Sequence, residues 1–366
     1  MKIGILTHYD VNNQGAQLQL FATYKVLEKL GHIPIVLTYR KNYDFIPQLE
    51  RRNQISLASV PYIIKHFLLE KGVKLTWHNV RKYLVNKRFR EQCFRSDRYH
   101  SASIDAALVG ADEVFSLELG VNMMMFGHGV NTENMIAYAP SCGQTDLDRI
   151  RQFHCEELIG SGLSRFKALS ARDEQTRKII HELTGKFAEL VCDPVLLYKF
   201  PLDTYRFPKE TPRKDYMVVY SYDARFVDSS EIEAVKEFAR KNHLLTVSPG
   251  TYHGWCDVNI VCNALEWLKC IQGAKAVVTD TFHGTIAAAI TNRPMAIYYS
   301  KSVNSSKMLD LVGRLGLEYR LLKEVSLREL ERVFAEDIDC LALNECIERY
   351  RQKSIGYLKN ALDLVK

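Results

Sequence analysis

Between residues 277 and 285 the chain reads Val277-Val278-Thr279-Asp280-Thr281-Phe282-His283-Gly284-Thr285. The apolar, mostly β-branched residues up to Val278 predict a buried strand. Small apolar residues from 286 to 290 predict a helix, which Asn292-Arg293-Pro294 ends. Gly284 permits a tight turn between the two. The stretch therefore predicts a strand, a polar turn and a helix, as in an α/β fold with a parallel sheet.

The polar side chains of this stretch stand where open α/β sheets bind ligands, at a strand's carboxyl end. A helix amino end also offers free N–H groups and a partial positive charge, which suit phosphate or carboxylate. We therefore predict substrate contacts from Asp280, Thr281, Gly284 and Thr285. The imidazole of His283 beside this anion site is a candidate for proton transfer. Alternatively, His283 only caps the helix and bonds a neighbour.

Length and proline spacing predict two domains. A chain of 366 residues is long enough for two ordinary cores. Residues 198–212 hold three prolines and no periodic pattern, which is typical of a boundary. We expect an N-terminal domain over 1–200 and a C-terminal domain over 213–345. We expect a helix over 346–366 to pack across both.

Composition excludes several classes of protein. No run approaches the ~20 apolar residues of a membrane span, and the start of the chain turns polar too early for a signal peptide. The nine cysteines show no CxxC pair and no metal-finger spacing. Their odd number and scatter are typical of reduced thiols in the cytosol. We expect a cytoplasmic protein that needs no metal and no cofactor.

The net charge of +6 is unevenly placed. Residues 40–100 carry 14 Lys and Arg against 5 Asp and Glu, so this segment is +9 and the remainder is −3. A local excess argues against a nucleic-acid binder and for a local anionic partner. Val60 to Leu68 has an amphipathic helical pattern, and Arg81-Lys82 and Lys87-Arg88 follow on a second expected helix. This segment is either a solvated basic face or a peripheral contact with an anionic membrane surface.

The first βαβ unit is predicted from the amino terminus. Lys2 to Thr7 and Ile33 to Tyr39 are expected parallel strands, joined by a helix over Leu18 to Leu30. The loop before the helix holds one glycine, so it is not a dinucleotide-binding fingerprint. Asn13, Gln14 and Gly15 stand where a ligand would meet the helix start. Alternatively, the amides only cap the helix.

Further strand ends carry polar residues. Strands expected over 106–109, 136–139, 166–170 and 189–192 are followed by Asp112, Ser141, Arg172 and Asp193, respectively. We predict substrate contacts from Asp112 and Ser141. Arg172 is well placed for a bidentate contact with an anion, or else forms a salt bridge with Asp173 or Asp193. Lys301 and Lys307 in a later polar loop are further candidates for an anionic substrate.

Short motifs at these strand ends carry a resemblance to a known family. Along the chain they are Asn13-Gln14-Gly15-Ala16 with Leu18-Gln19, Gly110-Ala111-Asp112-Glu113-Val114-Phe115, Tyr138-Ala139-Pro140-Ser141-Cys142-Gly143, Ser170-Ala171-Arg172-Asp173, Asp193-Pro194 and Thr279 to Thr285. In this order they resemble the polysaccharide pyruvyl transferase family over about residues 1–320. The last motif is the most specific. The departures from the family's motifs include Gln14 for Tyr, Ala111 for Ser, Glu113 for Gln and Phe115 for Trp.

The resemblance implies a GT-B-like architecture, with two Rossmann-like parallel-sheet domains facing a cleft. It implies transfer of pyruvate from phosphoenolpyruvate to two hydroxyls of a sugar as a cyclic ketal. The acceptor would be a polysaccharide such as an exopolysaccharide, or its lipid-linked precursor, on the amino-terminal side. Arg172 would hold the donor phosphate or carboxylate, and His283 would be the acid/base group.

Two other functions fit the same pattern. A GT-B glycosyltransferase would use a nucleotide sugar and needs a carboxylate that fixes the ribose, for which Glu318 is the candidate. A non-catalytic protein would bind an anion or a glycan without turnover.

Overall fold

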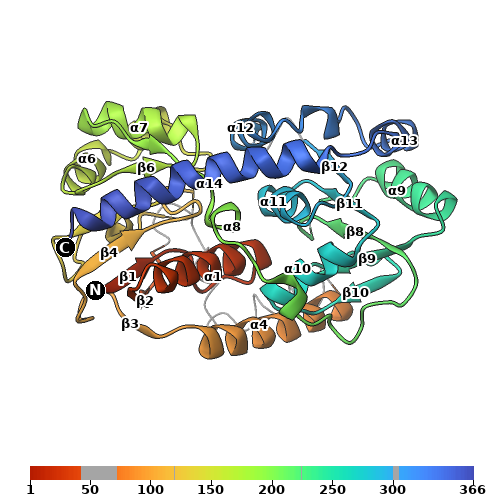
Figure 1. The fold of residues 1–366 in the computed structure, drawn as a ribbon, viewed down its shortest axis with the longest axis horizontal. Helices are drawn as coiled ribbons and strands as arrows, with labels where there is room; N and C mark the ends of the chain where they lie inside the picture. The colour runs from red at the N-terminus through yellow and green to blue at the C-terminus, as the bar shows by residue number, and fades with distance from the viewer. Residues whose placement is uncertain (43–71, 119, 224, 300–304) are drawn as a thin grey trace.

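The structure is a computed structural model that describes residues 1–42, 72–118, 120–223, 225–299 and 305–366 (Figure 1). The amphipathic pattern of Val60 to Leu68 and the candidate Lys301 lie outside these residues. Two parallel sheets stand side by side, one in each half of the chain.

The first sheet has the strand order β3-β2-β1-β4-β5, and every neighbouring pair is parallel. A bridge between Ile136 and Ala168 adds the short parallel pair β6 and β7 beside it. The strands are β1 (Lys2–Leu6), β2 (Ile33–Thr38), β3 (Ser96–Arg98), β4 (Ala106–Val109), β5 (Met135–Ala137), β6 (Ser170–Ala171) and β7 (Glu189–Leu190). The helices of this half are α1 (Gln14–Lys29), α4 (Val73–Cys93), η3 (Met123–Phe126), α5 (Leu147–Gln152), α6 (Glu156–Ser164), α7 (Glu174–Thr184) and α8 (Pro194–Leu197).

Helix α1 begins four residues earlier than the sequence pattern predicts. The Asn13 side chain accepts a hydrogen bond from the N–H of Ala16 and so caps the helix. The leucine spacing that marks the helix starts only at Leu18, because Gln14 and Gln17 occupy buried positions in the first turn. One predicted role of the loop amides, helix capping, is therefore present in Asn13.

The second sheet has the order β10-β9-β8-β11-β12-β13 and is also parallel throughout. Its strands are β8 (Tyr216–Tyr220), β9 (Leu245–Pro249), β10 (Val258–Ile260), β11 (Ala276–Thr279), β12 (Met295–Tyr298) and β13 (Leu321–Leu322). Its helices are η4 (Leu202–Thr204), α9 (Ser229–Lys241), α10 (Ala264–Gly273), α11 (Phe282–Ile290), α12 (Ser305–Leu315), η5 (Glu318–Arg320) and α13 (Leu327–Ala335). The strand and helix expected around residues 277–290 are β11, near the middle of this sheet, and α11.

The two halves share one hydrophobic core. Leu18 and Tyr198 of the first half lie in the same buried cluster as Trp267 and Ile286 of the second. Two further clusters lie within single halves. We propose that residues 1–200 and 213–345 are the two domains, joined by this shared core rather than by a polar, mobile interface.

Helix α14 (Cys340–Asp363) runs across both halves (Figure 1). It begins six residues before the expected helix, because Asp339 caps it by accepting from the N–H of Ala342. The Tyr357 hydroxyl donates to the Ala137 carbonyl at 2.9 Å in the first half. Tyr350 contacts Arg314 of α12 in the second half. The helix therefore ties the two sheets together.

The anchoring of α14 can be tested at Ser354. Its buried hydroxyl accepts from the N–H of Cys192 at 2.9 Å and donates to the Tyr350 carbonyl. Ser354→Ala leaves the Cys192 N–H unpaired in the interior, which costs about 1–3 kcal/mol. We expect a lower midpoint of urea unfolding. The control Ser161→Ala, at an exposed site in α6, should change stability by less than about 0.5 kcal/mol; equal effects would contradict the anchoring role.

Candidate active site

A cavity of about 340 Å³ lies between the two sheets. In a parallel sheet the carboxyl ends of all strands meet at one edge, and here the edges of both sheets supply its walls. The first half contributes His8, Asn13, Asp112, Glu113, Ser116, Glu118, Asn122, Gln144 and Arg172. The second half contributes Tyr220, Tyr222, Arg225, Asp280, Thr281, Phe282, His283, Tyr298, Tyr299, Lys307 and Met308.

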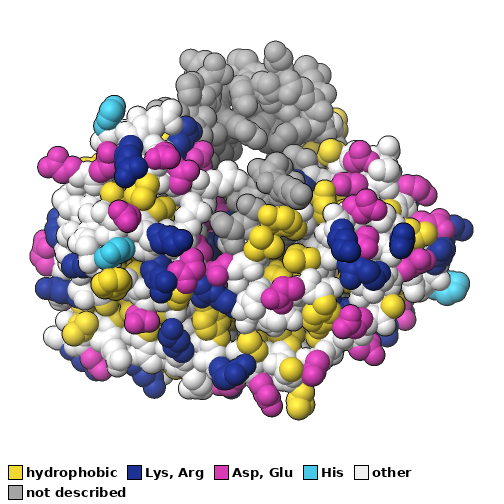
Figure 2. Space-filling view, turned by 90° about the horizontal axis from the view of Figure 1, so that it is seen from above, with side chains coloured by type: hydrophobic (Ala, Val, Ile, Leu, Met, Phe, Trp, Pro, Cys, Tyr) yellow, Lys and Arg dark blue, Asp and Glu magenta, His cyan; other side chains and the backbone are white. Residues whose placement is uncertain are grey.

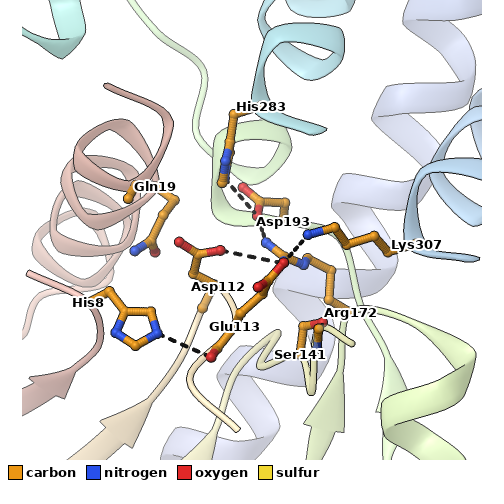
Figure 3. Close-up of polar contacts among 12 residues, drawn as sticks. His8, Gln19, Asp112, Glu113, Ser141, Arg172, Asp193, His283 and Lys307 are labelled. Atoms are coloured by element: carbon orange, nitrogen blue, oxygen red, sulfur yellow. Dashed lines mark hydrogen bonds and ion pairs between the residues drawn. The ribbon is translucent and has the colours of Figure 1, made fainter. Parts of the chain in front are cut away.

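A buried carboxylate joins the two predicted catalytic residues (Figure 3). Asp193 Oδ2 accepts from Arg172 Nη1 at 2.9 Å and lies 3.5 Å from His283 Nε2. Arg172 Nη2 also contacts Asp112 Oδ1 at 3.5 Å. The side chains of Arg172 and Asp193 are only 2% and 0% exposed. The guanidinium is thus held between two carboxylates, and the Phe282 ring packs 4.4 Å from its central carbon.

The buried charges of this group keep one another ionised. Burial acts to raise the pKa of Asp112, but Arg172 and His283 hold that pKa well below its ordinary value. Burial likewise acts to raise the pKa of Asp193, and the nearby His283 and Arg172 lower it. Burial acts to lower the pKa of Arg172, which the two carboxylates raise. Asp112, Asp193 and Arg172 are therefore all charged at neutral pH, and each has a partner of opposite charge.

Local sequence places each carboxylate. Asp193 caps α8 by accepting from the N–H of Val195 at 2.9 Å, and Pro194 starts that helix. Asp112 follows β4 with a φ of 78°, a left-handed conformation that Asp tolerates better than most residues. This conformation turns its carboxylate toward Arg172.

His283 is positioned by close packing at the start of α11. The Thr281 hydroxyl caps this helix by accepting from the N–H of Gly284 at 3.0 Å. A Cβ on Gly284 would lie 2.3 Å from Thr279 Oγ1, so only glycine fits there. A Cβ on Gly15 would lie 2.4 Å from His283 Cβ, so the start of α1 packs directly on the imidazole. Gly15 and His283, from opposite halves of the chain, are therefore in contact.

Two further cations in the cavity are paired with carboxylates. Arg225 Nη1 donates to Asp280 Oδ2 at 2.9 Å, and its guanidinium lies over the Tyr222 ring. Lys307 contacts the Glu113 carboxylate. The wall of the cavity therefore carries paired cations and acids together with tyrosines, rather than a surface of one charge.

The structure brings together seven of the predicted site residues on the wall of this cavity: Asn13, Asp112, Arg172, Asp280, Thr281, His283 and Lys307. The salt bridge of Arg172 with Asp193, one of its two predicted roles, is present. The other predicted role, contact with an anion, stays a prediction.

Other predicted residues lie behind the wall. Ser141 is fully buried and donates to Asp173 Oδ2 at 2.6 Å, so its hydroxyl serves the turn before α7. The Thr285 hydroxyl donates to the Thr281 carbonyl within α11. Gly15 and Gly284 pack closely around His283 and Thr279, respectively. Gln14 lines a separate cavity.

Several residues of the wall are not among the predicted site residues. His8 follows β1, and its Nε2 lies 3.1 Å from the Glu113 carbonyl. Tyr222 and Arg225 follow β8. The same rule that selected Asp280, a polar residue just past a buried strand, applies to all three. Glu113 sits beside the predicted Asp112 in a quoted motif, four residues past the end of β4.

The basic segment divides between surface and interior. Lys82 was expected on a basic face together with Arg81, Lys87 and Arg88. It is instead buried, because its ammonium reaches across to donate to the Gly250 carbonyl at 2.9 Å. The other three remain on the accessible part of α4.

The face that carries α7, α12 and α13 shows Lys and Arg interspersed with Asp and Glu (Figure 2).

Within the described ranges, no helix is long and apolar enough to cross a membrane. The same part of the chain holds no group of three or more His, Cys, Asp or Glu side chains placed to bind a metal ion.

Solved structures define the class of fold. The chain is similar to S. aureus MnaA in complex with UDP, with 11% identity, a TM-score of 0.50, and 99% and 97% of the two chains covered. It is also similar to Arabidopsis thaliana UGT89C1 complexed with quercetin, with 10% identity, a TM-score of 0.50, and 100% and 99% coverage. At such low identity the likeness concerns the fold alone, which is GT-B-like as expected.

The family follows from the sequence itself. Residues 13–302 match the sequence profile described as "Polysaccharide pyruvyl transferase". This chain belongs to the polysaccharide pyruvyl transferase family. Among curated proteins, no sequence matches it.

The Arg172 ion pairs predict a pH dependence of stability. Because the pKa values of Asp112 and Asp193 are lowered in the folded protein, their contribution is complete above their ordinary pKa of about 4. It is lost as the pH falls through that value toward the lowered pKa values. Arg172→Leu removes the buried partner of Asp112 and Asp193, and breaking a buried ion pair costs about 3–5 kcal/mol at pH 7.

We therefore expect calorimetry to give a lower Tm for Arg172→Leu at pH 7 and a shallower loss of stability between pH 5 and 3 than in the wild type. The matched control Arg165→Leu removes a more exposed arginine, whose guanidinium lies 3.8 Å from Glu133, and should run parallel to the wild type. Equal slopes in Arg172→Leu and the wild type would show that Arg172 does not hold these carboxylates ionised.

Proposed function

We propose that this protein transfers pyruvate from phosphoenolpyruvate to two hydroxyls of a sugar and forms a cyclic ketal. The observation that carries the proposal is that His283 and Arg172, both on the wall of the cavity, contact one buried carboxylate, that of Asp193. It places a proton donor and a fixed cation side by side. Family membership supports the same reaction class.

The donor carries a phosphate and a carboxylate, so its site needs cations and amide donors. Thr281 caps the N–H of Gly284, which leaves the earlier N–H groups of α11, those of Phe282 and His283, for an anion. Arg172 and Lys307 supply positive charge on the same wall. We assign the donor to this side of the cavity.

The reaction needs an acid because an enol ether is a poor electrophile. A protonated His283 gives its proton to the methylene carbon, and C2 becomes cationic. A sugar hydroxyl adds to C2 and loses its proton to the neutral imidazole. The C2–O bond to phosphate then breaks with the electron pair going to phosphate, which makes C2 cationic again. The second hydroxyl adds to C2, and its proton goes to the released phosphate. The products are the ketal and inorganic phosphate.

Asp193 and Arg172 have distinct parts in this scheme. Asp193 Oδ2 faces Nε2 of His283 and so fixes the orientation of the ring. Arg172 offers its guanidinium to the donor oxygens while Asp112 and Asp193 hold it in place. We assign the acceptor, a polysaccharide or its lipid-linked precursor, to the side of the cavity formed by the first half. The site of action would be the cytoplasm, with peripheral contact at an anionic membrane through α4.

The residue expected to mark a glycosyltransferase, Glu318, lies away from the cavity. Glu318 was the candidate for a carboxylate that fixes a ribose. It is exposed in η5 and lies outside the wall of the cavity.

The reaction is tested by incubating the protein with phosphoenolpyruvate and galactosides, glucosides or mannosides in D₂O. We expect phosphate release and a ketal methyl that appears as CH₂D by NMR and mass spectrometry, since the solvent supplies one hydrogen. His283→Ala and His283→Gln should lower kcat by ~10²–10⁴-fold, as for a lost general acid, with smaller effects on KM.

The exposed His243→Gln, in the loop after α9, is the matched control and should keep the wild-type kcat. An unlabelled methyl group would exclude protonation from solvent. A nucleoside diphosphate released from a sugar donor would favour the glycosyltransferase, and binding without turnover would favour a non-catalytic role.

A substitution at Glu113 is expected to strengthen donor binding rather than to impair the reaction. The Glu113 carboxylate forms an ion pair with Lys307, one of the cations that we assign to donor binding. Glu113→Gln removes the competing charge, so we expect KM for phosphoenolpyruvate to fall by about 3–10-fold, as for about 1 kcal/mol of released pairing. Glu118→Gln removes the same charge from the cavity wall but frees Arg149 instead, and should change KM less. A raised KM in Glu113→Gln would assign Glu113 to substrate binding.

A further inference from the structure

A second cavity of about 240 Å³ lies beside the first, again between the two halves. Asn13, Tyr220 and Tyr222 line both cavities. Gln14 lines only the second and precedes Gly15, which packs on His283. About 10–15 Å³ of such space holds one water, so the second cavity has room for a ligand well beyond a single water.

The lining of the second cavity is polar and rich in carboxamides. It consists of Asn12, Asn13, Gln14, Asn79, Lys82, Tyr220, Tyr222, Asp223, Gly250 and Thr251. A carboxamide both donates and accepts hydrogen bonds, as a hydroxyl does. Lys82 and Asp223 bring one positive and one negative charge, so the lining favours a neutral ligand over the anionic donor.

Gln14 contributes an unused acceptor to this lining. Its Nε2 donates to the Cys262 carbonyl at 2.9 Å, which fixes the carboxamide. Its Oε1 is buried and, among the described residues, has no hydrogen-bond partner. A buried polar atom without a partner is costly, and a hydroxyl of a ligand in the cavity would satisfy it.

The other side chains hold this arrangement in place. Asn79 Nδ2 lies 3.4 Å from Asp223 Oδ2, and Lys82 donates to the Gly250 carbonyl. A Cβ on Gly250 would lie 2.7 Å from Gln14 Cδ, so glycine is needed for the carboxamide to fit. The site is thus built from α1, α4 and the loops after β8 and β9.

We propose that the second cavity binds a neutral sugar unit of the acceptor, next to the unit that receives the ketal beside His283. This inference rests on the proposed function for the identity of the acceptor. Gln14 is then a specificity residue, because its Oε1 accepts from a hydroxyl of that neighbouring unit. A tyrosine at position 14, the residue in the family's motif, would fill the space and remove the acceptor atom.

The test compares methyl glycosides of galactose, glucose and mannose with the matching β-1,4-linked disaccharides by isothermal titration calorimetry, without donor. We expect at least one disaccharide to bind about tenfold more tightly than its methyl glycoside, because only the disaccharide reaches both cavities. Gln14→Tyr should abolish that gain. Asn79→Ala, a milder change in the same lining, should reduce it if Gln14→Tyr fails to fold.

Gln92→Ala, at an exposed position of α4 outside the lining, is the matched control and should keep the full gain. The proposal is overturned if no disaccharide binds more tightly than its methyl glycoside, or if both variants of the lining keep the gain. Because sugar binding is measured without turnover, a protein that shows the gain but releases no phosphate from phosphoenolpyruvate would refute the proposed reaction and retain the sugar site.

Discussion

The structure of the site depends on the ion pair between Asp193 and Arg172. Both side chains are buried, and a buried charge that loses its partner is strongly destabilising. Asp193 can meet Arg172 and His283 only if α8 of the first half lies against α11 of the second. The packing of α1 on the same helices and the crossing of α14 are consistent with this one requirement. Stability and the geometry of the candidate active site are therefore coupled at one carboxylate.

The cavity contains its own counter-charges. Arg172, Arg225 and Lys307 each face a carboxylate of this chain. Fixed pairs of this kind hold the cations in position before a ligand arrives, which favours electrostatic preorganisation. They also mean that an anionic donor must share or displace an internal carboxylate. The affinity for the donor is then the difference between the ion pairs that the donor forms and the internal ion pairs that it displaces. Of the carboxylates that face Arg172 and Lys307, Glu113 is the most exposed and therefore the most easily displaced.

Much of the fold was predictable because the strands are short, apolar and bounded by polar turns. Helix α11 and β11 follow directly from the residues around His283, and the capping box of Asn263 and Glu266 marks the start of α10. The start of α1 was missed because Gln14 and Gln17 are polar residues that are nevertheless buried. Lys82 is another polar residue that is buried, and its burial was missed because its partner Gly250 lies in the other half of the chain.

Local periodicity and turn chemistry are enough to identify which segments become parallel strands and which polar residues stand at their carboxyl ends. They therefore predict Asp112, Arg172, Asp280 and His283 as neighbours of a ligand. How those side chains pair follows from the packing of distant segments. Whether Arg172 faces Asp193 or solvent, and whether Ser141 faces Asp173 or the cavity, depends on contacts between residues 20 or more positions apart. The joining of Gln14 to the second half is likewise a property of the shared core, which no local pattern specifies.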